Sequence, residues 1–166
     1  MNYLKFIATI LFSSLLLTAC NEEGKLSLSE RSVIYCAEGS PETFNPQLVT
    51  SGTTIDATSN QLYERLISYQ DGGNTLSPAI AKSWHVTADG RKVTFYLRKN
   101  IAFHQTDYFT PSRLLNADDV IFSFKRVLDS QHPYHLVSGG NYPFFQNIDL
   151  NDLIEKIEKI NNYTVR

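Results

Sequence analysis

The sequence predicts an α/β fold of the α+β kind, in which short helices and strands are joined by loops. Residues 57–69 and 116–128 place apolar side chains at helical spacing. Residues 84–98 instead alternate apolar and polar side chains on both sides of an Asp-Gly turn. The composition, with 42% hydrophobic and 19% charged residues in a chain of 166, is that of an ordinary globular protein. We therefore expect one folded domain that contains both kinds of element.

The first twenty residues have the organisation of an export signal. Lys5 provides a weakly positive start, and residues 6–17 are almost wholly apolar but too short for a stable membrane-spanning helix. The segment ends in Leu17-Thr18-Ala19-Cys20, where small residues precede a cysteine, as in the lipobox of bacterial lipoproteins. The alternative is an ordinary cleaved signal that a cysteine follows by chance.

The lipobox-like motif predicts how the protein is anchored. We expect a lipoprotein signal peptide at residues 1–19 and lipidation of Cys20, which becomes the first mature residue. Several acyl chains, palmitate among them, give stable membrane attachment where one chain would bind only marginally. The polar residues 20–30 then form a flexible tether. The predicted location is the periplasm, anchored by lipid to a cell membrane.

The mature chain is predicted to begin with a strand, a loop and a helix. Residues 32–36 are β-branched and aromatic, which favours a strand. Gly39-Ser40-Pro41 and Asn45-Pro46 mark the loop. Asp56 is the predicted N-cap of a helix over residues 57–69.

A β-hairpin follows the turn expected at residues 71–74. Its strands are predicted at residues 84–87 and 92–98, with Ala88-Asp89-Gly90 between them. Asp-Gly between two strand patterns is a strong hairpin signal.

The next predicted element is a helix that opens at Asn116-Ala117-Asp118-Asp119. Asn116 is a good N-cap, and the helix dipole favours the two aspartates in the first turn. Adjacent helical positions point in different directions, so the two carboxylates are assigned to capping rather than to catalysis. The buried stripe is expected to consist of Val120, Phe124, Val127 and Leu128.

The last third of the chain is predicted to be a loop, a helix and the start of a strand. Residues 129–149 are rich in Pro, Gly, Asn and His, and residues 150–160 are amphipathic at helical spacing. Residues 163–166 begin a strand pattern at the end of the sequence. From this ending we expect the sequence to be a truncated piece.

Charge and motifs exclude several function classes. The net charge of -2, from 15 basic and 17 acidic residues, predicts no nucleic-acid partner. No phosphate-binding glycine motif and no nucleophile–base pair is recognisable, so no catalytic residue and no enzyme activity is predicted. His104, His132 and His135 lack companions at zinc-site spacing, so no metal site is predicted.

Seven motifs follow one another along the mature chain: YCAEGSP (35–41), FNPQL (44–48), TSGTT (50–54), LSPAIAKSWHVTADGRKVTFYLRKNIAF (76–103), NADDVIFSF (116–124), HPYH (132–135) and VSGG (137–140). Together they resemble the family 5 bacterial extracellular solute-binding proteins. Within that family they are most similar to the periplasmic dipeptide-binding proteins and their haem-binding lipoprotein relatives. The likeness covers most of residues 32–166.

The resemblance implies a two-lobed periplasmic binding protein with an accessory domain inserted early in the first lobe. Residues 31–68 would start lobe one, and residues 69–166 would form most of the accessory domain, left incomplete. The implied function is that of a substrate-binding lipoprotein of an ABC importer, which binds dipeptides or short peptides. Haem or glutathione are further ligands that this branch suggests, with haem as cargo rather than as a cofactor.

The resemblance also implies partners and site residues. The partners are the permease subunits in the inner membrane and, through the acyl chains on Cys20, the lipid bilayer, with the protein itself a monomer. Thr50 resembles a ligand contact of lobe one, and Ser51 and Gly52 shape the loop beside it. Cys36 resembles a cysteine whose disulfide partner lies in a later part of the family's chain. The residues that hold the two ends of a dipeptide also lie further downstream in the family.

Three alternatives stay open from the sequence. The first alternative is a truncated lipoprotein fragment that binds nothing. The second is a sister protein that binds cationic antimicrobial peptides, and the third is a small periplasmic enzyme. Stability separates the first from the binding hypotheses, because an isolated part of lobe one would expose apolar surface.

Overall fold

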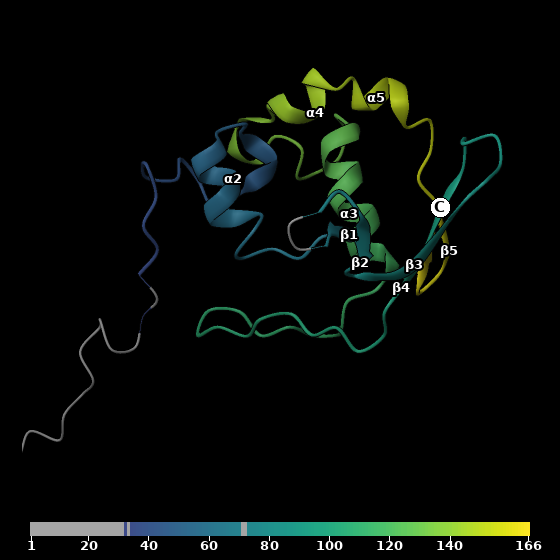
Figure 1. Ribbon diagram of the computed structural model, residues 1–166, viewed down its shortest axis with the longest axis horizontal. Coiled ribbons are helices and arrows are strands. Elements are labelled where there is room, and N and C mark those ends of the chain that lie inside the picture. The colour runs from purple at the N-terminus through teal and green to yellow at the C-terminus, as the bar shows by residue number, and fades with distance from the viewer. Residues whose placement is uncertain (1–31, 33, 71–72) are drawn as a thin grey trace, which may run out of the picture. The chain divides into compact units, whose positions relative to one another are not determined.

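The computed structural model describes residues 32, 34–70 and 73–166 of the chain (Figure 1). The chain divides into two units, Met1–Cys36 and Ala37–Arg166, and all the helices and strands below belong to the second. The predicted signal peptide and tether lie outside the described residues. Among the described helices, none is both long and apolar enough to cross a membrane.

The strand predicted over residues 32–36 is wrong for the part that can be checked. Ile34, Tyr35 and Cys36 are exposed and have no strand conformation. A β-branched and aromatic run becomes a strand only where another strand pairs with it. The pairings in the described part of the chain join other segments.

An antiparallel sheet forms the centre of the second unit. Its strands, in spatial order, are β3 (Ala81–Val86), β4 (Val93–Leu97), β6 (Thr164–Val165) and β5 (Lys159–Asn161). The last strand in the sequence is therefore paired on both sides, with β4 and with β5. Figure 1 accordingly shows the C-terminus beside the other strands of this sheet.

The predicted β3–β4 hairpin is confirmed. Val86 pairs with Val93, and the Asp89 carboxylate accepts hydrogen bonds from the Thr87 hydroxyl at 2.6 Å and from the Arg91 N–H at 3.1 Å. Gly90 has φ +70°, a conformation that side-chain-bearing residues rarely adopt. The Asp-Gly pair therefore supplies both the side-chain acceptor and the backbone freedom that the turn requires.

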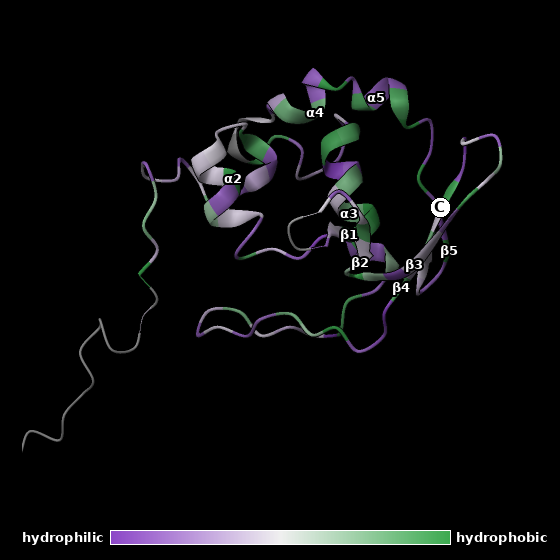
Figure 2. Ribbon diagram, in the orientation of Figure 1, coloured by the Kyte–Doolittle hydropathy of each residue, from purple (hydrophilic) through white to green (hydrophobic). Residues whose placement is uncertain are grey.

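Helix α3 (Ala117–Leu128) packs on the sheet and closes the core. Ala117 and Val120 from the helix meet Ala81, Leu97 and Val165 from the strands in one buried cluster. Ala81 and Ala117 are fully buried, and their small side chains let helix and sheet approach closely. Figure 2 shows the matching alternation of hydrophobic and hydrophilic residues along α3, which confirms the helix that its spacing predicted.

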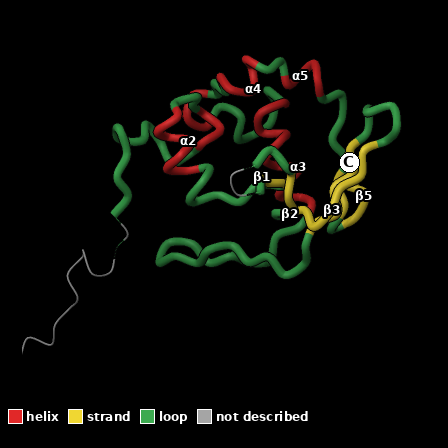
Figure 3. Tube along the Cα trace, in the orientation of Figure 1, coloured by secondary structure: helices red, strands yellow, loops and turns green. Residues whose placement is uncertain are grey.

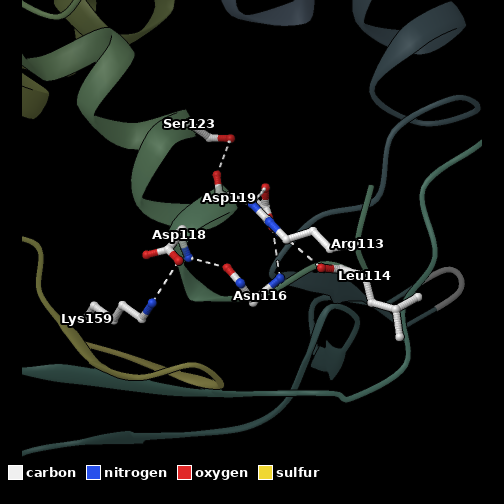
Figure 4. Close-up of polar contacts among 7 residues, drawn as sticks. All are labelled: Arg113, Leu114, Asn116, Asp118, Asp119, Ser123 and Lys159. Atoms are coloured by element: carbon white, nitrogen blue, oxygen red, sulfur yellow. Dashed lines mark hydrogen bonds and ion pairs between the residues drawn. The ribbon is translucent and has the colours of Figure 1, made fainter. Parts of the chain in front are cut away.

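The first turn of α3 carries the predicted cap. The Asn116 side-chain oxygen accepts the Asp118 N–H at 2.8 Å, and the Asp119 carboxylate accepts the Asn116 N–H at 2.9 Å (Figure 4). Arg113 binds both oxygens of Asp119, at 2.6 and 2.9 Å, whereas Asp118 pairs with Lys159 at 2.7 Å. The two carboxylates therefore have separate structural partners, as the capping interpretation predicts.

The helix predicted over residues 57–69 is wrong in its position. Helix α2 spans Gly52–Thr58 with Ser51 as its N-cap, so Asp56 lies inside the helix rather than before it. Beyond Thr58 the chain turns, and residues 67–69 form strand β1 (Ile67–Tyr69), which pairs with β2 (Leu76–Pro78). Pairing with β2 overrides the apolar spacing that favoured a helix. Of the turn predicted at residues 71–74, the structure describes residues 73 and 74.

The last third of the chain also departs from its prediction. The expected loop contains η4 (Val137–Gly139) and α4 (Pro143–Asn147), and helix α5 (Leu150–Leu153) ends long before residue 160. Residues 159–161 are strand β5 instead, because this stretch pairs with the chain end. The backbones of Glu158 and Arg166 exchange two hydrogen bonds, at 2.7 and 2.9 Å.

Loops account for much of the second unit (Figure 3). A short 3-10 helix, η3 (Pro46–Leu48), lies in the loop before α2, and a long irregular segment joins β4 to α3. The segment around η3 is the one that carries the predicted ligand residues.

The Asp119→Asn substitution tests the cap of α3. Burial opposes ionisation of Asp119, but hydrogen bonds from Arg113 and from the Asn116 N–H outweigh it and hold its pKa below the ordinary 3.8. The ionised form therefore stabilises the folded state above that ordinary value, and the contribution is lost as the pH falls through the lowered pKa. At pH 7 we expect the variant to be less stable by about 0.5–1 kcal/mol.

Chemical denaturation of wild type and variant, followed by circular dichroism between pH 7 and pH 2.5, provides the measurement. The stability difference should shrink towards acid pH. Asp107→Asn, which removes the same charge from an exposed loop, is the matched control and should change stability little. A difference that is constant over this pH range would contradict the assigned role of the Asp119 carboxylate.

Candidate functional site

The predicted ligand residues lie at the junction between a loop and the start of helix α2. Thr50 is exposed, Ser51 is half-buried and Gly52 is the first residue of the helix. The Ser51 hydroxyl accepts the Thr54 N–H at 3.5 Å and so caps the helix, and its contact with a ligand stays a prediction. Of Thr50 and Ser51, Thr50 is the more exposed to solvent. We call residues 42–52 the ligand loop.

Buried hydroxyl groups fix the helix against one end of the ligand loop. Thr54 and Thr58 are fully buried. The Thr54 hydroxyl accepts the Glu42 N–H at 3.0 Å, and the Thr58 hydroxyl donates to the Thr54 carbonyl at 2.5 Å. Because a buried hydroxyl without a partner is costly, the bond between Thr54 and Glu42 holds the start of the ligand loop on α2, whereas the Thr58 hydroxyl finds its partner within the helix.

Further hydrogen bonds shape the middle of the ligand loop. The Asn45 side-chain oxygen accepts the Gln47 N–H at 3.2 Å and caps η3. The Phe44 carbonyl accepts the Tyr63 hydroxyl at 2.8 Å, from the segment that follows α2. The loop is therefore tied to its own sequence neighbours at several points.

One side chain of the ligand loop reaches across to helix α3. The Gln47 amide nitrogen donates to the Ser123 carbonyl at 3.1 Å, and its oxygen accepts from the Arg126 guanidinium at 3.2 Å. These are contacts across 76 and 79 residues of sequence. The ligand loop is thus joined directly to the helix that closes the core.

The arrangement offers hydrogen bonding rather than covalent chemistry. The Thr50 hydroxyl can donate to and accept from a peptide main chain. At Gly52 a Cβ atom would meet no described atom within 4 Å, which leaves room for close approach of a ligand. A hollow of about 410 Å³ opens between α3, α4 and α5, and residues 50–52 do not line it.

The histidines do not gather into a metal site. The His132 ring contacts Phe122 at a centroid distance of 5.0 Å, whereas the His135 ring packs on Tyr142 at 5.2 Å. The His135 ring nitrogen Nδ1 also lies 2.8 Å from the Arg126 carbonyl. Within the described residues, no group of three or more His, Cys, Asp or Glu side chains could hold a metal ion.

The two cysteines of the prediction differ in what can be observed. Cys36 has an exposed free thiol, and its pairing with another part of the family's chain stays a prediction. Cys20 lies outside the described residues, so its lipidation also stays a prediction.

Sequence reasoning missed the residues that hold the ligand loop. Thr54 belongs to a hydroxyl-rich run that was recognised, but nothing in the run separates its buried member from its exposed ones. Gln47 and Arg126 are far apart in the sequence, and each alone has the pattern of a surface residue. Only a structure, or covariation between the two positions, could have paired them.

Both a family model and individual relatives match the sequence of this chain. The family model described as bacterial extracellular solute-binding proteins, family 5 Middle, matches residues 75–166, more than half of the chain. The dipeptide-binding protein of Escherichia coli (strain K12) is 48% identical over 140 residues, which is 84% of this chain and 26% of that protein.

A haem-binding relative and a solved structure match as well. Heme-binding protein A of Haemophilus influenzae is 40% identical over 98% of this chain and 32% of its own length. The crystal structure of a dipeptide-binding protein from Pseudoalteromonas sp. SM9913, in complex with Met-Leu, superposes with a TM-score of 0.75 at 49% identity. That match covers 79% of this chain and 26% of that one. The chain thus spans about a quarter to a third of the length of these proteins.

The Thr54→Val substitution tests the anchoring of the ligand loop on α2. Valine keeps the shape of threonine but removes the acceptor for the Glu42 N–H. We expect the free energy of unfolding to fall by about 1–2 kcal/mol, the cost of leaving a polar group without its partner. Thermal denaturation measures the change. Thr53→Val, at the neighbouring position that is not fully buried, is the control and should cost clearly less. Equal losses at the two positions would contradict the role given to the Thr54 hydroxyl.

Proposed function

We propose that this chain, which belongs to the family 5 bacterial extracellular solute-binding proteins, is part of a receptor for dipeptides or short peptides. The receptor would deliver its ligand to an ABC importer and perform no chemistry itself. The observation that carries the proposal is the exposed residue Thr50, which lies in a loop that several hydrogen bonds hold in place. The sequence is also 48–49% identical to proteins named for dipeptide binding.

A hydroxyl of this kind suits a receptor that accepts many peptides. It can bond to the peptide main chain, which all peptides share, without contact to their side chains. The ligand loop provides Thr50 with such a position, and Ser51 and Gly52 set the local backbone. The groups that would hold the ends of a peptide are expected outside this chain, in agreement with the downstream positions that the family resemblance implies.

The proposed domain assignment follows the same resemblance. Residues 31–68 would begin lobe one and residues 69–166 would belong to the accessory domain. Permease subunits of the inner membrane are the proposed partners, and the proposed receptor acts as a monomer. Anchoring through acyl chains on Cys20 would keep it near that importer, in the periplasm.

Haem is a second candidate ligand, because a haem-binding protein is 40% identical over almost the whole chain. The His132 ring nitrogen Nδ1 accepts the Tyr134 N–H at 3.3 Å, but the ring lies beside the exposed side chains of Phe122 and Tyr134, which makes His132 the better of the two candidate haem-contacting histidines. His135 is engaged with the Arg126 carbonyl and Tyr142. A His132→Ala variant that keeps the haem affinity of the parent would remove this residue as a haem contact.

Ligand binding by the mature protein, purified in the length in which cells make it, tests the proposal. We expect Met-Leu to bind in isothermal titration calorimetry and Thr50→Ala to weaken binding about threefold to tenfold, the equivalent of one neutral hydrogen bond. Thr50→Ser should restore affinity, and Thr110→Ala, at an exposed loop threonine, should leave it unchanged.

The same titration separates the remaining hypotheses. Haem, glutathione and a cationic antimicrobial peptide complete the set of ligands. If one of these ligands binds and Met-Leu does not, the protein would be assigned to a sister group of the family. Failure of every ligand would overturn the receptor proposal and favour the non-binding lipoprotein.

A Cys20→Ala substitution tests the anchor. Without the thiol there is no site for acylation, so we expect the protein to leave the membrane fraction, or to stay unprocessed with its signal attached. Cell fractionation, with the intact mass of the wild-type protein, provides the measurement, and Cys36→Ala is the matched control. A Cys20→Ala variant that is processed and sediments with membranes like wild type would contradict lipid anchoring.

A further inference from the structure

The link between Gln47 and helix α3 stands apart from the other contacts of the ligand loop. The bonds to Thr54 and Tyr63 join the loop to segments close to it in sequence, whereas Gln47 binds an element almost eighty residues away. Both Gln47 and Arg126 are half-buried, where water competes less well for their hydrogen bonds.

The two partners of Gln47 are arranged to receive one amide group. Ser123 and Arg126 are three positions apart on α3, a spacing that places residues on the same face of a helix. A carbonyl acceptor and a guanidinium donor therefore face the loop together. A glutamine amide matches this pair in one orientation only, since the reversed amide would set donor against donor and oxygen against oxygen. The contact therefore fixes the rotation of the Gln47 side chain as well as its distance from α3.

Arg126 is itself held before it meets Gln47. Its Nε donates to the Tyr134 carbonyl at 3.2 Å, and its guanidinium lies 5.8 Å from the centre of the Tyr142 ring. The Tyr142 hydroxyl in turn donates to the His135 carbonyl at 2.7 Å. A guanidinium fixed on two other sides loses little freedom when it binds a further acceptor. Gln47 therefore docks onto a prearranged donor.

We propose, resting on the function proposed above, that Gln47 and Arg126 are positioning residues for peptide binding. They form a clamp through which accessory helix α3 holds the ligand loop in its binding conformation. Neither residue contacts the peptide. The clamp raises the fraction of molecules in which Thr50 is ready to bind, so its loss lowers the apparent affinity by that fraction.

This mechanism predicts a kinetic signature that a direct contact does not give. In Gln47→Ala or Arg126→Gln, a smaller fraction of molecules can bind when a peptide arrives, so kon should fall. Once bound, the peptide keeps its own contacts, so koff should stay near the wild-type value. We expect kon for Met-Leu to fall about threefold to tenfold, in line with the loss of one hydrogen bond. Thr50→Ala, which removes a direct contact, should instead raise koff.

Stopped-flow measurement of Met-Leu binding to the mature protein tests the clamp. Gln47→Glu keeps an acceptor for Arg126 but sets a carboxylate oxygen against the Ser123 carbonyl, so it should recover only part of the lost kon. The double variant Gln47→Ala, Arg126→Gln should lose little more than either single variant, because both break the same link. Gln105→Ala and Arg91→Gln, which change exposed residues in two other loops, are the matched controls and should behave like wild type.

Hydrogen exchange in the absence of ligand gives an independent second readout. In the clamp variants the amides of residues 42–49 should exchange faster, while those of β3 and β4 keep their wild-type protection. Unchanged exchange in residues 42–49 of the clamp variants would overturn the clamp. The same holds if the clamp variants keep the wild-type kon while Thr50→Ala does lose affinity. If wild type binds no peptide at all, the proposed function fails, and hydrogen exchange still decides whether the clamp orders the loop.

Discussion

The packing of helix α3 on the β3-β4-β6-β5 sheet is the constraint on which the other features of the second unit depend. Fully buried alanines on the two faces, Ala81 and Ala117, allow a close approach that larger side chains would prevent. The cap at Asn116 and the Arg113–Asp119 pair then set where the helix starts. With start and face fixed, Ser123 and Arg126 are presented on a helix whose position is determined by the core. Polar contacts therefore attach the ligand loop to a helix that the core holds in place.

Local signals predicted the elements whose stability is local. The β3–β4 hairpin was found because Asp89 and Gly90 make its turn within a few residues, and α3 because its cap and stripe lie within its own sequence. The predictions failed where strand pairing, rather than the spacing of apolar residues, decides the element, as in β1 with β2 and β5 with β6. Residues 159 and 160 continue the helical spacing of residues 150–160 but belong to β5, since β6 lies beside them and itself pairs with β4 almost seventy residues earlier.

Only part of the candidate site could be predicted from the sequence. Thr50, Ser51 and Gly52 could be proposed from a motif, because a family likeness preserves the order of residues along the chain. The Gln47–Arg126 contact could not, since neither residue differs from an ordinary surface residue until the fold brings them together. Asp56 shows the converse error. It is of a residue type that often caps helices, yet the cap is Ser51, which lies five residues earlier and accepts the Thr54 N–H with its side chain.

The two kinds of contact in the second unit suit two different requirements. Apolar burial is non-directional, so it can bring α3 onto the sheet but cannot orient a single side chain. Hydrogen bonds weaken steeply when their angles change, so they fix rotation as well as distance. A loop that presents one hydroxyl to a ligand needs its orientation fixed. The chain accordingly holds α3 with Ala81, Leu97 and Val165, and the ligand loop with donors and acceptors. A purely apolar contact at residue 47 would keep the loop near α3 but would not set the direction of Thr50. The amide group of Gln47 suits this position because both of its hydrogen bonds form in only one orientation.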